Sequence, residues 1–396
     1  MRPQGGDLIL IDVTRLIWRA WRGRHPTGID RVCLAYLEHF QRRASAVIHR
    51  KGLSLILPQA RSQRLFDLLL QGRRIPKASL ILVLARALLE AHISPPERGM
   101  FYLNVGHTGL NDRALPEWIS RKRIRAIHLI HDLIPITNPE FCRPGEAERH
   151  EVRLTNALLS ASGIIANSKA TLTELAAFAA RKSISMPPSV VAWISGFETL
   201  RRPPAKTLDQ PYFIAIGTIE ARKNHLVLLQ AWQRLVRKSG ERAPMLVIVG
   251  QPGWEAEQVL AWLENLGELE GKVVHLRSCG DSELAAWIAG ARALLMPSFA
   301  EGFGLPIVEA LALGTPVLAS NLPTFREIAG DLPTYLPSRD VHAWESLIEA
   351  FTGADPERER QLKRIGEYRA PTWDEHFRTV EDWMATLRAN QSAMSA

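Results

Sequence analysis

Cysteine is scarce in this chain of 396 residues, with only Cys33, Cys142 and Cys279, far apart in the sequence. This spacing excludes a disulfide framework and the clustered ligands of a structural zinc site. No apolar run reaches the roughly 18 residues that a membrane span needs. Arg86 and Glu90 interrupt the run "ASLILVLARALLEAHI", which predicts a packed helix. The first residues lack the apolar segment of a signal peptide, so we expect a cytoplasmic protein.

An Asp-x-Asp pair, which would hold a divalent cation under a diphosphate, is also missing. The nearest approach to it is the segment Asp281, Ser282 and Glu283. No group of residues has the spacing of a metal site, so we expect neither a bound metal nor a cofactor.

Charge is distributed unevenly along the chain. Residues 1–200 carry a net charge of +12 and residues 201–396 a net charge of −4. A basic half favours a polyanionic partner, such as nucleic acid, an acidic lipid surface or a phosphorylated substrate, although solvated surface arginines would also explain it. Helix-turn-helix, zinc and ribonucleoprotein motifs are absent, so we expect no nucleic-acid partner.

Short β-branched runs alternate with helix-length segments in both halves of the chain. Such runs predict parallel strands that helices bury on both faces. We therefore expect an α/β protein of two doubly wound, Rossmann-like domains that face each other across a cleft. The predicted strands are 8–13, 45–50, 100–105, 125–131, 163–168 and 189–194 in the first half, and 212–217, 245–250, 272–277, 291–297 and 316–320 in the second.

Composition also indicates the domain boundaries. Residues 200–211 are rich in proline and charge and poor in apolar residues, which is typical of a linker. This linker separates a predicted N-terminal domain, 1–199, from a C-terminal domain, 212–371. Residues 372–396 are predicted to form a final helix that crosses back to the N-terminal domain.

Two glutamates, Glu301 and Glu309, lie eight residues apart in the segment that follows the strand predicted at 291–297. Between them, Gly302 and Gly304 let the backbone approach a ligand, and the start of the next helix favours anionic oxygen. A carboxylate can accept hydrogen bonds from both hydroxyls of a vicinal diol. The pattern favours a sugar-nucleotide pocket, with a plain turn and a solvated helix glutamate as the alternative.

The run "PSFAEGFGLPIVEALALGTPV" closely resembles the signature of retaining glycosyltransferases of family 4, the glycosyl transferases group 1. The resemblance implies the GT-B fold and a nucleoside-diphosphate sugar donor. It implies that the donor is bound by Gly302, Phe303, Gly304, Leu305 and Glu309.

The segment "YFIAIGTIEARKNHLVLLQAW" resembles the first strand of that family's donor domain. The resemblance implies that Arg222 and Lys223 face the diphosphate and stabilise the charge that builds on the leaving group, unless they are a solvated pair. It implies that Glu301 positions the donor hexose. We expect the departing phosphate to help deprotonate the acceptor hydroxyl, although a displacement through Glu301 stays open.

In the first half, "IHLIHDLIPITNPE" resembles the family's His-Asp-x-x-Pro block. His131 is implied to hydrogen-bond the transferred sugar and Asp132 to orient it, although such a histidine is often structural. The loop "RGRHPTGIDRV" takes the place of a glycine-rich turn that lies under the donor phosphates and guides the acceptor. It offers Thr27 and Gly28 but lacks the usual double glycine, as in some polysaccharide-assembly mannosyl- and rhamnosyltransferases.

Two weaker matches complete the resemblance. "GIIANSKATLTEL" places Asn167, Ser168 and Thr171 at a strand end, where they serve the site or act only as caps. "CGDSELAAWIAGARALLMPS" is implied to place Cys279 and Gly280 beside the nucleotide base.

The predicted function is therefore metal-independent transfer of a hexose, with retention, in surface polysaccharide assembly. The donor would be GDP-mannose or a UDP- or dTDP-sugar, and the acceptor a saccharide or a lipid-linked saccharide. An epimerase of the same fold and a noncatalytic sugar-nucleotide-binding protein are the alternatives.

The basic N-terminal half suggests where in the cell the protein acts. Trp18 and Trp21 are interleaved with arginines in "RLIWRAWRGR", and a second basic run, "RKRIR", occupies 121–125. Indole and basic side chains together are suited to a lipid headgroup layer. We expect peripheral docking on an anionic membrane surface, at the inner face of the cell membrane. The alternative is that the tryptophans are buried.

Overall fold

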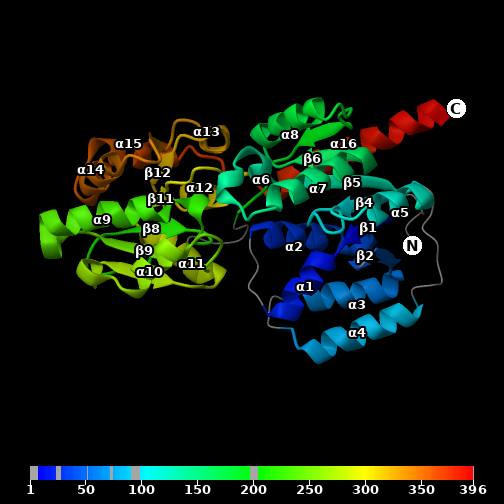
Figure 1. The fold of residues 1–396 in the computed structure, drawn as a ribbon, viewed down its shortest axis with the longest axis horizontal. Coiled ribbons are helices and arrows are strands. Elements are labelled where there is room, and N and C mark those ends of the chain that lie inside the picture. Colours follow the sequence, from blue (N-terminus) through cyan, green and yellow to red (C-terminus); the bar gives the residue numbers. More distant parts are fainter. Residues whose placement is uncertain are drawn as a thin grey trace. The chain divides into compact units, whose positions relative to one another are not determined.

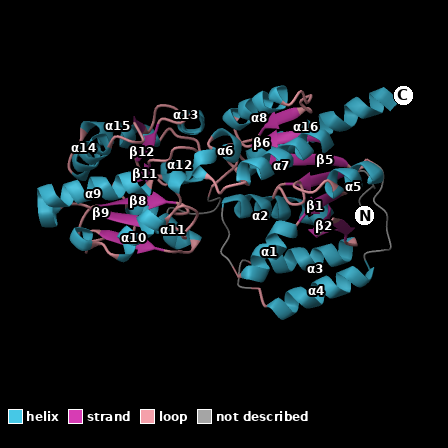
Figure 2. Ribbon diagram, viewed as in Figure 1, coloured by secondary structure: helices cyan, strands magenta, loops and turns pink. Residues whose placement is uncertain are grey.

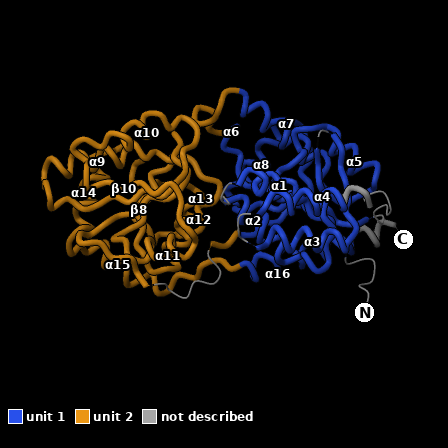
Figure 3. The backbone as a smooth tube through the Cα atoms, turned by 90° about the horizontal axis from the view of Figure 1, so that it is seen from below, with its two compact units in different colours: residues 1–136, 145–193, 373–396 blue, residues 137–144, 194–372 orange. Residues whose placement is uncertain are grey.

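The computed structural model describes residues 8–23, 28–50, 52–71, 75–90, 99–196 and 204–395. The chain divides into two compact units (Figure 3). Unit 1 comprises Met1–Ile136, Gly145–Trp193 and Trp373–Ala396, and unit 2 comprises Thr137–Pro144 and Ile194–Thr372. The final helix therefore belongs to unit 1, and a short segment from the first half of the chain belongs to unit 2.

Unit 1 is built on a seven-stranded sheet in the order β3-β2-β1-β4-β5-β6-β7, parallel except for β3. Helices lie on both sides of the strands (Figures 1 and 2). The strands are β1 (Ile9–Asp12), β2 (Ala44–Arg50), β3 (Leu53–Ile56), β4 (Phe101–Asn104), β5 (Arg125–Ile130), β6 (Ala161–Ala166) and β7 (Ser189–Val191). The helices are α1 (Thr14–Arg22), α2 (Gly28–Phe40), α3 (Gln59–Leu70), α4 (Lys77–Glu90), α5 (Ala114–Lys122), α6 (Ile134–Thr137, which ends in unit 2), α7 (Glu146–Ser160), α8 (Lys169–Arg181) and α16 (Trp373–Ser395).

Unit 2 repeats this architecture with a six-stranded parallel sheet in the order β10-β9-β8-β11-β12-β13. The strands are β8 (Tyr212–Ile216), β9 (Met245–Val249), β10 (Val273–Leu276), β11 (Leu294–Met296), β12 (Val317–Ser320) and β13 (Thr334–Leu336). The helices are α9 (His225–Ser239), α10 (Glu257–Glu264), α11 (Asp281–Gly290), α12 (Leu305–Ala312), α13 (Pro323–Ala329), α14 (Val341–Thr352) and α15 (Pro356–Ile365).

The central strands are apolar because helices cover both of their faces. Every residue of β4, β5 and β12 is buried, which is the pattern of a parallel sheet between two helical layers. Capping residues set several helix starts: Ser168 accepts a hydrogen bond from Thr171 N, and Asp340 and Asp355 cap α14 and α15. The predicted α/β fold of two doubly wound, Rossmann-like domains is confirmed.

Two strands were not predicted from the sequence. Both β3 and β13 are short strands at sheet edges and are only partly buried, so their apolar signal is weak. The helix expected at 78–93 is present as α4, but the prediction that it is packed holds only in part. Leu80 is buried, whereas Ile81 and Leu82 are 50% and 51% exposed. Within the described residues, no helix combines the length and apolar character needed to cross a membrane.

Of the predicted linker, residues 204–211 are described, and they belong to unit 2. They contain no helix or strand. The backbone N–H of Lys206 donates to the carbonyl of Ala286 in α11, so this stretch is anchored to the unit that follows it.

Candidate functional site

Two loops of unit 2 are joined at the carboxyl ends of β8 and β11, which are neighbours in the sheet. The Phe299 N–H in the second loop donates to the Arg222 carbonyl in the first, over 2.8 Å. Asn224 adopts a left-handed backbone conformation, and its side-chain amide donates to the carbonyls of Pro297 and Ser338. These bonds hold the predicted cationic loop against the loop that carries Glu301.

A cluster of charged side chains bridges the two loops. The Lys223 ammonium lies 2.5 Å from Glu301 Oε1, and the Arg222 guanidinium lies 2.9 Å from Glu301 Oε2. Ser298 donates a further hydrogen bond to Glu301 Oε1 over 2.7 Å, and Arg222 also pairs with Glu220 over 2.6 Å. Three residues that the sequence predicted for the site are therefore brought into direct contact.

The cluster is buried, and this determines its charge state. The side chains of Glu301 and Lys223 are only 7% and 10% exposed. Burial by itself would raise the pKa of Glu301, but Lys223 and Arg222 oppose it and lower the pKa to about 2. Glu301 is thus a carboxylate throughout the physiological range, held by two cations.

Two glycines that the sequence analysis did not select, Gly217 and Gly250, occupy positions near Lys223 where a side chain would not fit. A Cβ at Gly217 would lie 3.1 Å from Lys223 Cε, and one at Gly250 would lie 1.9 Å from the Gly217 carbonyl oxygen. Gly217 has a φ of +139°, which side chains rarely adopt. The sequence signal was available, since "AIG" and "IVG" both end a strand on glycine.

The second glutamate lies on α12. Glu309 is 3% exposed, and its side chain packs against Gly196, where a Cβ would lie 2.5 Å from Glu309 Cγ. Gly304 has a φ of +108° and immediately precedes α12, which begins at Leu305. Of the other residues predicted to bind the donor, Phe303 is buried and Gly302 lies in the same loop.

In unit 1, His131 follows β5 at the carboxyl edge of the sheet. Its Nε2 lies 2.8 Å from the Val105 carbonyl, to which it donates. Burial lowers the pKa of His131 to about 4, so the ring is neutral at neutral pH and its Nδ1 is an acceptor. Asp132 caps the backbone N–H of Ile134 over 3.2 Å, which is a structural use of one carboxylate oxygen.

Neighbouring residues fix the backbone at His131. Asn167 donates to the His131 carbonyl over 2.8 Å, while Ser168 caps α8. Two further imidazoles were missed by the sequence analysis. The centres of the His107 and His131 rings lie 5.1 Å apart, and His150 Nε2 lies 3.1 Å from the Asp132 carbonyl oxygen.

Thr27 lies outside the described residues, and Gly28 is the first residue of α2. Within the described part of the chain, no group of three or more His, Cys, Asp or Glu side chains is arranged to hold a metal ion.

Comparison with known proteins finds similarity mainly in the C-terminal part of the chain. Residues 196–368 match the family described as Glycosyl transferases group 1. The chain is 34% identical over 233 residues to the O-antigen chain mannosyltransferase B of Escherichia coli, an alignment that covers 57% of this chain and 60% of that protein. It is 28% identical over 248 residues to the serotype-specific mannosyltransferase WbdA of Escherichia coli, over 57% of this chain and 30% of that protein. The alignments thus cover less than two thirds of either relative.

Solved structures show the same fold over nearly the whole chain. The Anabaena protein Alr3699/HepE in complex with UDP matches with a TM-score of 0.63 at 16% identity, over 96% of this chain and 100% of that one. The sucrose-phosphate synthase of Thermosynechococcus elongatus matches with a TM-score of 0.65 at 15% identity, over 97% of this chain and 100% of that one. The predicted GT-B fold is confirmed.

Proposed function

Because residues 196–368 form a glycosyl transferases group 1 domain, we propose that the chain transfers a hexose from a nucleoside-diphosphate sugar to a saccharide or lipid-linked saccharide in surface polysaccharide assembly. The observation that carries this proposal is the cluster of Arg222, Lys223 and Glu301 at the carboxyl edge of β8 and β11. It combines cations for a diphosphate with a carboxylate for sugar hydroxyls.

Each charged residue has a separate role in this proposal. Arg222 and Lys223 bind the diphosphate and stabilise the negative charge that grows as the glycosidic bond breaks. Glu309 accepts hydrogen bonds from the ribose. His131 accepts a hydrogen bond from a hydroxyl of the transferred sugar, because its Nε2 proton is used on Val105.

The ion pairs limit what Glu301 can do. Its Oε1 already accepts hydrogen bonds from Lys223 and Ser298, and its Oε2 accepts one from Arg222. Since a carboxylate oxygen accepts about two hydrogen bonds, one position on Oε2 is left for a sugar hydroxyl. The same pairing lowers the nucleophilicity of the carboxylate. This supports a retaining reaction on one face of the sugar, in which the departing phosphate takes the acceptor proton.

The relatives guide the choice of donor. Both of the curated relatives named above are mannosyltransferases, which makes GDP-mannose the first donor to test. The Anabaena structure is a complex with UDP, so UDP-sugars are the second.

Product analysis with a labelled donor tests the proposal. Transfer of label to a saccharide with retained anomeric configuration is the expected result. A changed free sugar nucleotide would instead identify an epimerase, and binding without any turnover would identify a sugar-nucleotide sensor. Either of these outcomes would overturn the transferase function.

The contacts of the basic residues in unit 1 narrow the choice of surface for membrane docking. Arg15 and Arg19 lie 2.6 and 2.7 Å from the Asp30 carboxylate, so these arginines serve an internal ion cluster. In both views, α5, which carries Arg121 and Lys122, lies apart from α1 (Figures 1 and 3). The two basic runs therefore do not make one surface.

A different surface joins α1 to α4. Trp21 is 38% exposed, Ile81 and Leu82 are half exposed, and the Lys77 ammonium lies 5.5 Å from the centre of the Trp21 ring. We propose that this α1–α4 surface docks on anionic bilayers. Exposed apolar and indole groups enter the headgroup layer while basic side chains meet acidic lipid.

Sedimentation with liposomes tests this surface. Binding should require acidic lipid, weaken at high salt and fall when Ile81 and Leu82 are both changed to serine. Changing Arg121 and Lys122 to serine is the matched control and should have little effect. Equal sedimentation with neutral and acidic vesicles, or with neither, would refute docking but not glycosyl transfer.

A further inference from the structure

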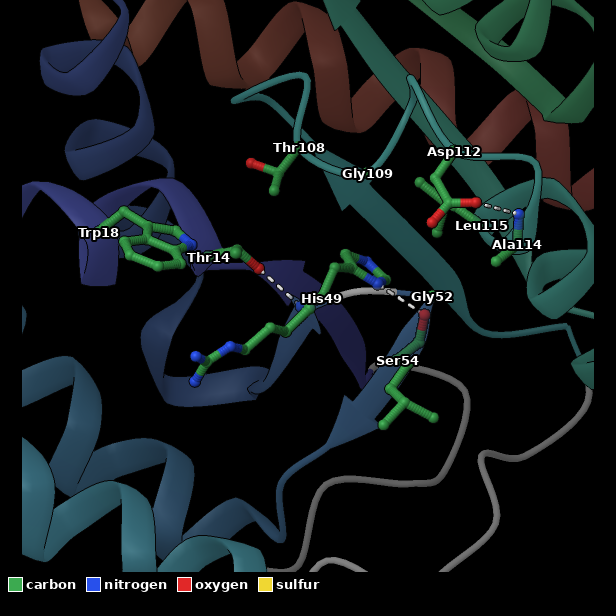
Figure 4. Close-up of a pocket in the computed structure, with 12 residues that line it drawn as sticks. Thr14, Trp18, His49, Gly52, Ser54, Thr108, Gly109, Asp112, Ala114 and Leu115 are labelled. Carbon is green, nitrogen blue, oxygen red and sulfur yellow. Dashed lines mark hydrogen bonds between the residues drawn. The ribbon is translucent and has the colours of Figure 1, made fainter.

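A cavity of about 310 Å³ opens in unit 1, beside the carboxyl ends of β1 and β2 and the loop after β4 (Figure 4). The chain order reverses between β1 and β4, and doubly wound sheets bind ligands at such a reversal. Its volume is at the lower end of the range for small-molecule sites, about 300 to 1,000 Å³, which suits one monosaccharide unit. None of the donor-site residues of unit 2 lines it.

Trp18 forms one wall of the cavity. Trp18 as a whole residue is 43% exposed, although it lies on a helix whose Leu16 and Ile17 are buried. The guanidinium groups of Arg22 and Arg50 lie 5.8 and 5.9 Å from the ring centre, which orients the indole. An exposed indole combines an apolar face with a polar edge, so it can cover the C–H face of a sugar ring.

Hydrogen-bond acceptors face the indole from other walls. Asp112 lies across the cavity from Trp18 in Figure 4, and its Oδ1 caps the Ala114 N–H over 3.0 Å. Its other oxygen projects toward Gly52, where a Cβ would lie 3.7 Å from Oδ2. The Asp112 carboxylate can accept hydrogen bonds from hydroxyl groups, and the Arg50 guanidinium, which also lines the cavity, can donate to them, so the lining suits a polyol.

A buried chain of hydrogen bonds orients the hydroxyl of Ser54, which also lines the cavity. The Tyr102 hydroxyl donates to Asp12 Oδ2 over 3.0 Å and accepts from His49 Nε2 over 2.7 Å. Burial lowers the pKa of His49 to about 4, so the ring is neutral and its Nδ1 must accept. Ser54 therefore donates to His49 Nδ1 over 2.6 Å and turns its lone pairs to the cavity, where they can accept from a ligand hydroxyl.

We propose that this cavity binds one hexopyranosyl unit of the acceptor, with its ring on Trp18 and its hydroxyls donating to Asp112 and Ser54. The assignment rests on the proposed transferase function. It is consistent with the position of His131, which follows β5 at the same edge of the sheet, next to β4.

Saturation-transfer NMR with methyl α-D-mannopyranoside and the full chain tests the cavity directly. The wild type should bind the glycoside, and Trp18→Ala should weaken its affinity about tenfold or more. Trp21→Ala is the matched control, because it removes an exposed tryptophan of the same helix that does not line the cavity, and it should bind as the wild type does. Ser54→Ala and Asp112→Asn should each weaken binding about three- to tenfold. Asparagine can still cap Ala114, so this change tests the carboxylate charge.

A second measurement separates this proposal from the donor site. Release of GDP from GDP-mannose without acceptor reports on unit 2 and should be the same in the wild type, Trp18→Ala and Trp21→Ala. Equal glycoside binding by all three proteins, or none by a wild type that turns over the donor, would overturn the acceptor cavity. Trp18-dependent binding without donor turnover by any protein, with UDP- and dTDP-sugars also inert, would support a saccharide cavity and overturn the transferase function. Trp18→Phe keeps an aromatic face and should restore part of the affinity lost in Trp18→Ala.

Discussion

The carboxyl edges of the two sheets differ in the ionisation state of their buried side chains. At the edge of unit 1, His49 and His131 are buried and uncharged, because burial lowers the pKa of each to about 4. At the edge of unit 2, Glu301 is buried but ionised, because Lys223 and Arg222 lower its pKa to about 2. Burial is the same in both places, and the presence of opposite charges decides the outcome.

This difference is the opposite of what the net charges of the two halves of the chain would suggest. The basic half, with +12, holds the neutral imidazoles of His49 and His131 at its edge, whereas the acidic half, with −4, places two cations around Glu301. Net charge reports on the surface, where most ionised groups lie. A buried charge costs free energy unless a partner compensates it, so charge at a site follows local pairing.

Removing the carboxylate should have the largest effect. Glu301→Ala leaves Lys223 and Arg222 buried with one partner fewer, which should lower the free energy of unfolding of unit 2 by about 3 to 5 kcal/mol. Urea unfolding measures this loss. Glu268→Ala is the matched control, because Glu268 pairs with Arg237 on the surface, and its loss should be much smaller. Equal losses in the two variants would show that the buried cluster is not held by charge.

Removing the ammonium should act on chemistry more than on binding. Lys223→Ala should slow transfer about 10²- to 10³-fold, because the lysine charge matters most as the leaving diphosphate forms. Single-turnover rates at saturating donor measure this step. Lys238→Ala, which removes a surface lysine of the same unit, should leave the rate unchanged. A parental rate in Lys223→Ala would remove that residue from the mechanism.

His131 and Glu301 should respond to acid in different pH ranges. A neutral buried histidine destabilises the folded state once the pH falls below the unfolded pKa of 6.5, and for His131 this loss is complete near its folded pKa of about 4. Glu301 contributes stability above pH 4.5 that is lost as the pH falls toward 2. The stability that depends on His131 should therefore be lost at higher pH than the stability that depends on Glu301, by up to about 3 kcal/mol.

Urea unfolding from pH 7 to pH 4 measures this dependence. His131→Asn should make this dependence shallower, whereas His342→Asn, at an exposed histidine, should not. An unchanged slope in His131→Asn would contradict the neutral, buried state of that ring.

Glu309→Ala should weaken donor binding with a smaller effect on stability. The ribose role predicts a loss of about 1.5 to 3 kcal/mol per hydrogen bond to the carboxylate. Titration calorimetry with GDP and with GDP-mannose measures the loss, and it should be similar for the two ligands because both carry the ribose. Parental affinity for both would end the ribose assignment.

Chelation should have the smallest effect of all. Transfer should survive EDTA, because in the proposed mechanism the cations of Arg222 and Lys223 stabilise the diphosphate in place of a metal. Loss of activity that magnesium or manganese restores would contradict this role.

Much of the fold was predictable because parallel strands are continuous apolar runs. Each predicted strand overlaps an observed one, whereas β3 and β13 were missed because partly buried edge strands carry little signal. The site was predictable as a location, since Arg222 and Glu301 both follow strands whose carboxyl ends share one edge. The ion pair between Arg222 and Glu301 was not predictable, because 79 positions separate these two residues and only the sheet order makes them neighbours.

The sequence by itself therefore determined the two-unit α/β architecture, the resemblance of the C-terminal part to a known family and the residue types of the candidate site. Local periodicity and short motifs encode these features. Only the tertiary structure decided that Glu301 is shared between two cations, that the arginines of α1 divide between Asp30 and the Trp18 ring, and that Ser54 faces a cavity. Each of these depends on side chains from separate strands and helices, and their distances follow from the order of strands and the packing of helices.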